Sequence, residues 1–157
     1  MQDGEQKFWK LIGKMDVCML STFAGNVIHA RPMHAVARPD YSDIVMLTDR
    51  ELTKDNEIER NHSVTLTYSD GSNTFISVQG TADISTDRAT INDVWNPAAK
   101  IYWPEGQDNP SIVAIVVTPH NVEYWDGDNK FLSGIKIAYG LATHSTPSLG
   151  ENKKLHL

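Results

Sequence analysis

Cysteine is nearly absent from this sequence of 157 residues, in which Cys18 stands alone. A lone cysteine excludes an internal disulfide and a zinc site built from several cysteines, so we interpret Cys18 as a buried, small apolar residue. No run approaches the roughly 18 consecutive apolar residues of a membrane-spanning helix. The N-terminal segment MQDGEQKFWKLIGKM is too polar for a secretory signal. We therefore expect a cytoplasmic protein with no part in a membrane.

Basic residues are also scarce, since 14 Lys and Arg face 20 Asp and Glu and leave a net charge of −6. Binding along nucleic-acid phosphates needs clustered positive charge, so we expect no nucleic-acid partner. The motifs GxSxG, GxGxxG and the P-loop do not occur, which leaves serine hydrolases, Rossmann enzymes and nucleotidases without support. HExxH is missing too, and His29 and His34 fall on opposite faces of one expected strand, so no metal site is expected.

Short segments with strand character, separated by turn residues such as Gly25-Asn26, make up most of what is present. Most neighbouring segments have no helical crossover between them, which favours antiparallel pairing. We therefore predict a mainly β fold, a small antiparallel β-barrel with helical insertions, in a single domain over residues 1–157. The expected strands lie in residues 16–37 (two strands), 43–48, 63–68, 75–84, 111–119 and 121–126.

Helical segments are expected at residues 8–15, 49–61, 86–95 and 96–103. Asp49 is a plausible N-cap for the second of these, and Thr86 or Asp87 for the third. Residues 111–119 are almost continuously apolar, which is typical of a strand buried on both faces. The polar tail, about residues 141–157, is expected to be loosely ordered.

Arg31 is the first residue that points to a binding site. In an extended strand it shares a face with His29, Met33 and Ala35, and the proline at position 32 places that strand at an edge or a bulge. A guanidinium among mostly apolar neighbours needs a partner. An anionic ligand, one of the chain's own acids and open water are the three alternatives, and the strand pattern leaves them open.

The segment MLTDRELTK, residues 46–54, runs from the end of an expected strand into the start of an expected helix. Lys54 lies near that start, where free backbone N–H groups and the helix dipole favour a phosphate. Because Arg binds phosphate through two hydrogen bonds and Lys adds a point charge, we predict that Arg31 and Lys54 converge on one phosphate. Aromatic residues that either pack or line a cleft for a planar cofactor are Trp95, Tyr102, Trp103, Tyr124 and Trp125.

The chain resembles a known family in several of these segments taken in order, over about residues 8–127. The segments are MLSTFAGNVIHARPM, VMLTDRELTK, FISVQGTADIS and VWNPAAKIYWPEGQDNPSIVAIVVTPHNVEYWD. They are similar to the general stress proteins among the pyridoxamine 5′-phosphate oxidase-like flavin-binding split barrels. The resemblance implies a six-stranded antiparallel split barrel that forms a homodimer, with FMN in a groove between the two subunits. FAD is the alternative flavin, and related barrels that use deazaflavin or haem keep those cofactors open.

The resemblance also implies which side chains contact the flavin. The matching residues are Arg31, Pro32, Met33, Leu47, Thr48, Lys54, Gln79 and Trp103. Arg31 and Lys54 would hold the phosphate. Leu47 and Thr48 would lie along the flavin ring. Gln79 and Trp103 would add contacts from a strand and from the partner subunit.

Two features depart from the family. Leu52 stands where the family often has Ser, and losing a hydroxyl that bonds the phosphate weakens binding by about 1–2 kcal/mol. The C-terminal segment SLGENKKLHL has no counterpart to the Arg-rich substrate-binding end of true pyridoxamine phosphate oxidases. That vitamin oxidase activity is therefore not expected.

Three functions stay open on this sequence. The first is an FMN-dependent oxidoreductase that uses a small-molecule electron donor or acceptor, with the redox chemistry carried by the cofactor. The second is a flavin reservoir or redox sensor without turnover. The third, to which Leu52 points, is a barrel dimer that has lost its ligand and serves as an interaction module. We favour the first and assign no catalytic residue.

Overall fold

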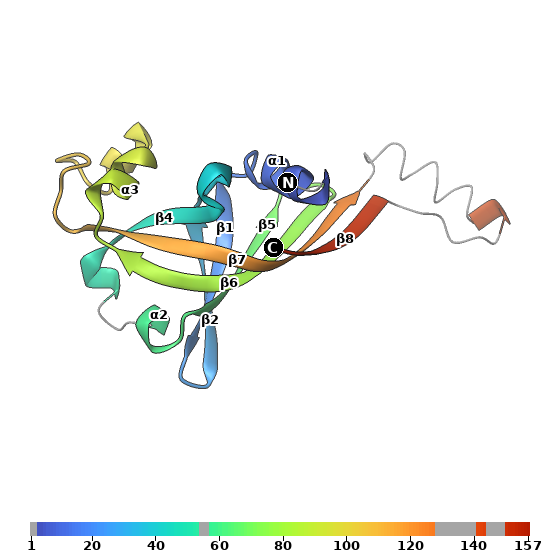
Figure 1. Ribbon diagram of the computed structural model, residues 1–157, viewed down its shortest axis with the longest axis horizontal. Coiled ribbons are helices and arrows are strands. Elements are labelled where there is room, and N and C mark those ends of the chain that lie inside the picture. The colour runs from blue at the N-terminus through green and yellow to red at the C-terminus, as the bar shows by residue number, and fades with distance from the viewer. Residues whose placement is uncertain (1–2, 54–56, 128–140, 144–149) are drawn as a thin grey trace.

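The computed structural model describes residues 3–53, 57–127, 141–143 and 150–157. In these ranges eight strands form one antiparallel sheet in the order β2-β1-β5-β6-β7-β4-β3, and β8 pairs with β7 (Figure 1). The strands are β1 (Val17–Ala24), β2 (Val27–His34), β3 (Val36–Arg38), β4 (Asp43–Asp49), β5 (Ser63–Ser69), β6 (Thr74–Ser85), β7 (Ile112–Gly127) and β8 (Gly150–His156). The helices are α1 (Asp3–Ile12), α2 (Glu57–Arg60) and α3 (Arg88–Asp93), with 3-10 helices η1 (Pro39–Tyr41), η2 (Arg50–Thr53) and η3 (Pro97–Ile101). The mainly β, antiparallel prediction is confirmed.

β1 and β2 form a hairpin that is paired along its whole length, from Val17 opposite His34 to Ala24 opposite Val27. The turn between the strands is Gly25-Asn26, as predicted. Gly25 has a φ of 63°, in the left-handed region that glycine adopts without steric cost.

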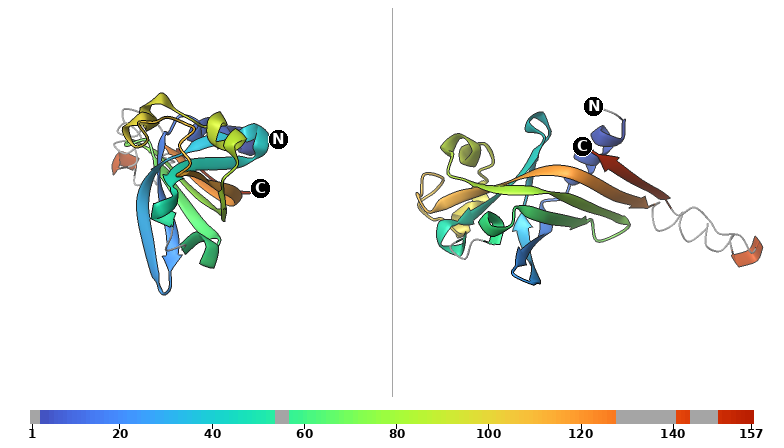
Figure 2. Two further views of the ribbon diagram at one scale, coloured as in Figure 1. Left: turned by 90° about the vertical axis from the view of Figure 1, so that its left-hand side faces the viewer. Right: turned by 60° about the horizontal axis from the view of Figure 1, so that its bottom comes forward.

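The chain passes from one edge of the sheet to the other at Ala35. β2 is one edge strand, β3 is the other, and only Ala35 separates them in sequence. The two edges must therefore approach each other, and β2 contacts β4. The N–H of Ala35 donates to the carbonyl oxygen of Asp16 at 3.0 Å, which ties the passage to the start of β1. The sheet thus curls around a core without closing, as the end-on view in Figure 2 shows, and this form agrees with the predicted split barrel.

β6 and β7 are the longest strands and cross the molecule together (Figure 1). On its other edge, β7 pairs first with β4 and then with β8. The register of β6 and β7 shifts at a bulge between Gln79 and Gly80. A Cβ at Gly80 would lie 2.3 Å from the carbonyl oxygen of Thr118, so the close approach of β7 requires a glycine there.

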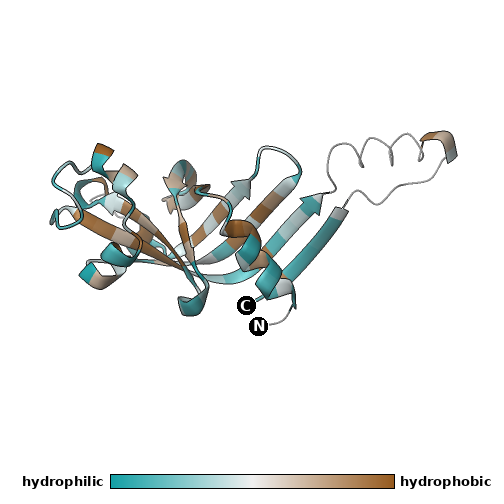
Figure 3. Ribbon diagram, turned by 90° about the horizontal axis from the view of Figure 1, so that it is seen from above, coloured by the Kyte–Doolittle hydropathy of each residue, from teal (hydrophilic) through white to brown (hydrophobic). Residues whose placement is uncertain are grey.

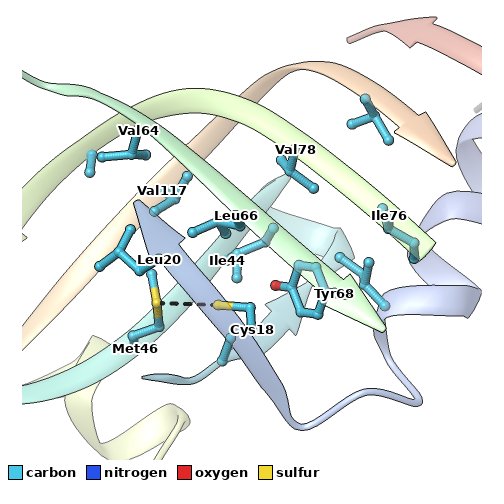
Figure 4. Packing of buried hydrophobic residues seen from close by; sticks show 14 of the residues in the cluster. Cys18, Leu20, Ile44, Met46, Val64, Leu66, Tyr68, Ile76, Val78 and Val117 are labelled. Atoms are coloured by element: carbon cyan, nitrogen blue, oxygen red, sulfur yellow. Dashed lines mark hydrogen bonds between the residues drawn. The ribbon is translucent and has the colours of Figure 1, made fainter. Parts of the chain in front are cut away.

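The main core fills the interior of the curled sheet, where side chains from β1, β4, β5, β6 and β7 meet (Figure 4). α1 packs against it through Phe8, Trp9 and Ile12. Cys18 is 1% exposed, and its sulfur lies 4.0 Å from that of Met46. Burial raises the pKa of the Cys18 thiol to about 11. The interpretation of Cys18 as a buried residue is confirmed.

A second cluster lies on the outer side of β4 and β7, under α3 and η3. Ile91, Val94 and Trp103 pack there against Val45 and Ala114. β4 and the first half of β7 are therefore buried on both faces, which confirms the prediction for residues 111–119. Helix α3 begins as predicted too, because the Asp87 carboxylate accepts the N–H of Thr90 at 2.9 Å.

Several regions differ from what the sequence suggested. The expected strands at 111–119 and 121–126 are one continuous strand, β7. Segment 49–61 contains the separate short elements η2 and α2, and residues 54–56 lie outside the described ranges. The polar tail includes β8, which was not expected and which is largely hydrophilic in Figure 3. Polar contacts join β8 to the body of the protein, since the Lys7 ammonium lies 2.6 Å from the Glu151 carboxylate and 2.7 Å from that of Asp126. Among the helices of the described ranges, none combines the length and the apolar character that crossing a bilayer requires.

Candidate functional site

Arg31 projects from edge strand β2 on the same side of the sheet as the main core. Residues directly opposite in an antiparallel ladder share a face. Arg31 pairs with Leu20 and Met33 pairs with Cys18, and both of these β1 residues are buried. Arg31 therefore shares a face with His29 and Met33, as the alternation of the sequence predicted.

The Arg31 guanidinium belongs to a compact polar cluster made of Thr22, His29, Arg31 and Glu57, which we call the Glu57 cluster. Arg31 Nη2 donates to Glu57 Oε2 at 2.5 Å, and it also donates to the Thr22 hydroxyl. That hydroxyl in turn donates to Glu57 Oε2. The second carboxylate oxygen, Oε1, lies 2.7 Å from His29 Nδ1. Three donors thus converge on one carboxylate.

The surroundings of this carboxylate favour its charged form. The Thr22 hydrogen bond is the largest cause, followed among the favourable ones by hydrogen bonds from Arg31 and His29, and together they lower the pKa of Glu57 to about 2. The Thr22 residue is 1% exposed, and the Glu57 side chain is 18% exposed. Glu57 belongs to α2, which lies beside β1 and is anchored by the buried Ile58 (Figure 1).

Of the three alternatives for Arg31, the structure shows the pairing with an acid of the chain's own. The Arg31 side chain nevertheless stays 42% exposed, so solvent still reaches it. Thr22 and Glu57 were not among the predicted site residues. The alternation of β1 places Thr22 toward the core, and this signal was available; Glu57 was assigned to a surface helix, and nothing local in the sequence links it to Arg31.

The remaining predicted residues divide between the two faces of the sheet. Thr48 lies on the core side of β4, the side that Arg31 and Met33 occupy, because it follows Met46 in the alternation. Leu47 lies on the opposite side and packs against the second cluster. Pro32 and Gln79 face outward on β2 and β6. Within one chain, these residues therefore do not line a single cavity.

Trp103 is buried within its own chain, and Lys54 lies outside the described residues. Trp103 is 7% exposed in the second cluster, and its Nε1 donates to the Asp49 carboxylate at 3.3 Å. Most of its ring is therefore used for packing within its own chain. Lys54 lies outside the described residues, so its predicted convergence with Arg31 stays a prediction. Leu52, at the position of the missing hydroxyl, is 77% exposed.

The surface of the protein has two hollows large enough to consider as ligand sites. The smaller, about 340 Å³, lies across β1, β2, β5, β6 and β7 and includes Thr22, Phe23, Ile28 and Gln79 in its lining. Its volume is at the lower end of the range for small-molecule sites, about 300–1,000 Å³. The larger, about 610 Å³, lies beside α1, and none of the predicted site residues lines it. In the smaller hollow, the lining residues Phe23, Ile28 and Gln79 face outward, whereas the side chains of Thr22, His29 and Arg31 lie on the core side of the sheet. We therefore place the candidate site at the Glu57 cluster itself.

The outer face of the β1–β2 hairpin carries an exposed apolar strip. Its members are Val17, Met19, Phe23, Ile28 and Pro32. Ile28 is 63% exposed and Val17 is 54% exposed. Contiguous apolar surface of this kind is characteristic of a face that meets a protein or a ligand.

The chain belongs to the pyridoxamine 5′-phosphate oxidase like family, whose model matches residues 3–148. This span includes every predicted site residue, and it confirms the family resemblance that the sequence motifs indicated. No protein with a curated description matches the sequence.

Solved structures of general stress proteins share the fold. General stress protein 26 from Jannaschia sp. CCS1 superposes with a TM-score of 0.80 at 21% identity, over 100% of both chains. General stress protein 26 from Bacillus anthracis gives a TM-score of 0.69 at 26% identity, covering 79% of this chain and 95% of its own. The general stress FMN/FAD binding protein from Xanthomonas citri gives 0.65 at 24% identity, covering 80% and 89%.

Proposed function

We propose that this protein binds FMN through its phosphate at Arg31 and acts as a flavin-dependent oxidoreductase linked to the general stress response. The observation that carries the proposal is the convergence of Thr22, His29 and Arg31 on one anionic group, in a chain of this family. The relatives support the flavin and the stress response through their descriptions, since one of them is a general stress FMN/FAD binding protein.

The side chains at the Glu57 cluster fit a phosphate monoester. A phosphate monoester accepts hydrogen bonds from a guanidinium, a hydroxyl and an imidazole. The bonds from charged donors are the strongest. Arg31 lies at an edge strand and is partly open, so a ligand can approach it from solvent. FAD, which carries a diphosphate in place of the terminal phosphate, is the alternative ligand for the same donors.

The bound flavin would supply the redox chemistry, accepting a hydride or electrons from a small-molecule donor and passing them to an acceptor. The chain's own residues would bind and orient it. Arg31 would hold the phosphate on the core side of the sheet. The apolar strip and Gln79, on the outer side, would offer contact surface to the second subunit of the proposed dimer or to the flavin that it holds. No residue is assigned a catalytic role.

We also propose that the protein forms a homodimer with the flavin between the subunits. Two observations support the dimer. The apolar strip on β1 and β2 leaves large side chains exposed in the single chain. The predicted flavin contacts lie on both faces of the sheet, so one chain alone does not enclose a planar ring with all of them.

The test is an absorption spectrum of the purified protein before and after loading with FMN, followed by anaerobic addition of NADH or NADPH. A yellow protein whose flavin is reduced, and which then turns over with an acceptor, supports the oxidoreductase. Flavin binding without reduction by any donor in a panel supports the second function, a reservoir or redox sensor. A protein that takes up neither FMN nor FAD contradicts both.

A further inference from the structure

We infer that Glu57 is an internal competitor for the phosphate site: its carboxylate occupies the Thr22, His29 and Arg31 donors, and a phosphate must displace it to bind. This inference rests on the proposed function and deepens it, because it assigns to Glu57 a built-in control of the affinity of the phosphate site.

The geometry shows a complete anion site that is already filled. Both oxygens of Glu57 are in use, Oε2 by Thr22 and Arg31 and Oε1 by His29. A carboxylate and a phosphate present oxygens of similar size and charge to the same donors. The charge of Glu57 also cancels that of Arg31, so an approaching phosphate meets little net attraction until the carboxylate has left.

Displacement requires a side-chain rotation and no rearrangement of the fold. The neighbouring Ile58 is 7% exposed and belongs to the main core, which fixes the backbone of α2. The Glu57 side chain is 18% exposed, so it has a path toward solvent. Thr22, His29 and Arg31 stand on the paired strands β1 and β2, so their backbone stays in place when the carboxylate leaves.

Displacing the carboxylate lowers the affinity of the wild-type protein for any phosphate ligand. A hydrogen bond to a charged group contributes enough to stability that breaking it changes an equilibrium by about tenfold to a hundredfold. Glu57→Gln keeps the shape of the side chain but removes its charge. We therefore expect this variant to bind FMN and inorganic phosphate at least about tenfold more tightly than the wild type, and riboflavin, which has no phosphate, equally well.

The experiment is isothermal titration of the full-length chain with FMN, riboflavin and inorganic phosphate at constant ionic strength. Glu59→Gln is the matched control, since it removes the same charge from an exposed residue of the same helix. Glu57→Asp is a second variant, because its shorter side chain no longer spans the distance to all three donors. Circular dichroism and the unfolding midpoint of each variant verify its fold.

Each outcome decides a different point. Tighter binding of FMN and phosphate by both Glu57 variants, without a change for riboflavin or for Glu59→Gln, supports the inference. Unchanged or weaker binding of phosphate ligands overturns it and makes Glu57 a positioning residue for Arg31. If no form of the protein binds FMN but the Glu57 variants bind phosphate more tightly, the proposed function fails and the inference stands.

Discussion

Acid should destabilise this protein partly through Glu57, and Glu57→Gln should remove that part. The pKa of Glu57 is about 2 in the folded chain, against an ordinary value of 4.5. A carboxyl with a lowered pKa stabilises the fold at pH values above its ordinary pKa. This contribution is lost as the pH falls from about 4.5 through about 2, because the unfolded chain then binds a proton that the folded chain does not.

The size of the effect follows from the same two values. Their difference corresponds to about 3.5 kcal/mol at most, at about 1.4 kcal/mol for each pH unit. Solvent reaches part of the side chain and screens the interaction, and the range from pH 5 to pH 3 covers only part of the titration. We expect the wild type to lose about 1–2 kcal/mol of unfolding free energy more than Glu57→Gln over that range.

The assay is urea unfolding of both proteins at pH 5 and pH 3, followed by tryptophan fluorescence, because Trp9 and Trp103 are buried and report on unfolding. Glu59→Gln serves as the control and should behave as the wild type does. Equal losses of unfolding free energy in the wild type and in Glu57→Gln would refute the reasoning. They would mean that the three donors do not hold the carboxylate in the folded chain.

Three further predictions concern the rest of the molecule. The Cys18 thiol, whose pKa is raised to about 11 by burial, should resist a thiol reagent at pH 8 until urea unfolds the chain; rapid labelling of the folded protein would show that it is accessible. Gly80→Ala should lower the unfolding free energy by about 2 kcal/mol or more, because the added Cβ meets the Thr118 carbonyl; an unchanged urea midpoint would mean that β7 moves aside at no cost. Ile28→Asp should turn the proposed dimer into a monomer in size-exclusion chromatography with light scattering, whereas Ile101→Asp, at an 81% exposed residue of η3, should not; a wild-type monomer, or an Ile28→Asp dimer, would count against the strip as the interface.

Local patterns in the sequence were sufficient for most of the fold. Gly25-Asn26 identified the hairpin, Asp87 identified the start of α3, and the apolar run at 111–119 identified a strand buried on both faces. β8 was missed because Gly150–His156 has no apolar alternation, and its pairing depends on β7 and on contacts of Glu151 with Lys7. These contacts join residues far apart in the chain, so no local pattern reports them.

The candidate site was also predictable only in part, because local sequence patterns report the face of a residue but not its distant partners. Alternation along β2 gave the face of Arg31 correctly, since orientation in a strand is a local property. The partner of Arg31 was not predictable, because Glu57 is 26 residues away and belongs to a helix whose polar composition is typical of a solvent-exposed segment. α2 leads directly into β5, and the pairing of β5 with β1 brings this helix beside the β1–β2 hairpin.

The measurement that tests the central claim most directly is the affinity of the protein for FMN compared with riboflavin, in the wild type and in Arg31→Ala. If Arg31 binds the phosphate, FMN should bind more tightly than riboflavin to the wild type, and Arg31→Ala should abolish that preference. Equal affinities for the two flavins in the wild type, or a preference for FMN that survives in Arg31→Ala, would contradict the account.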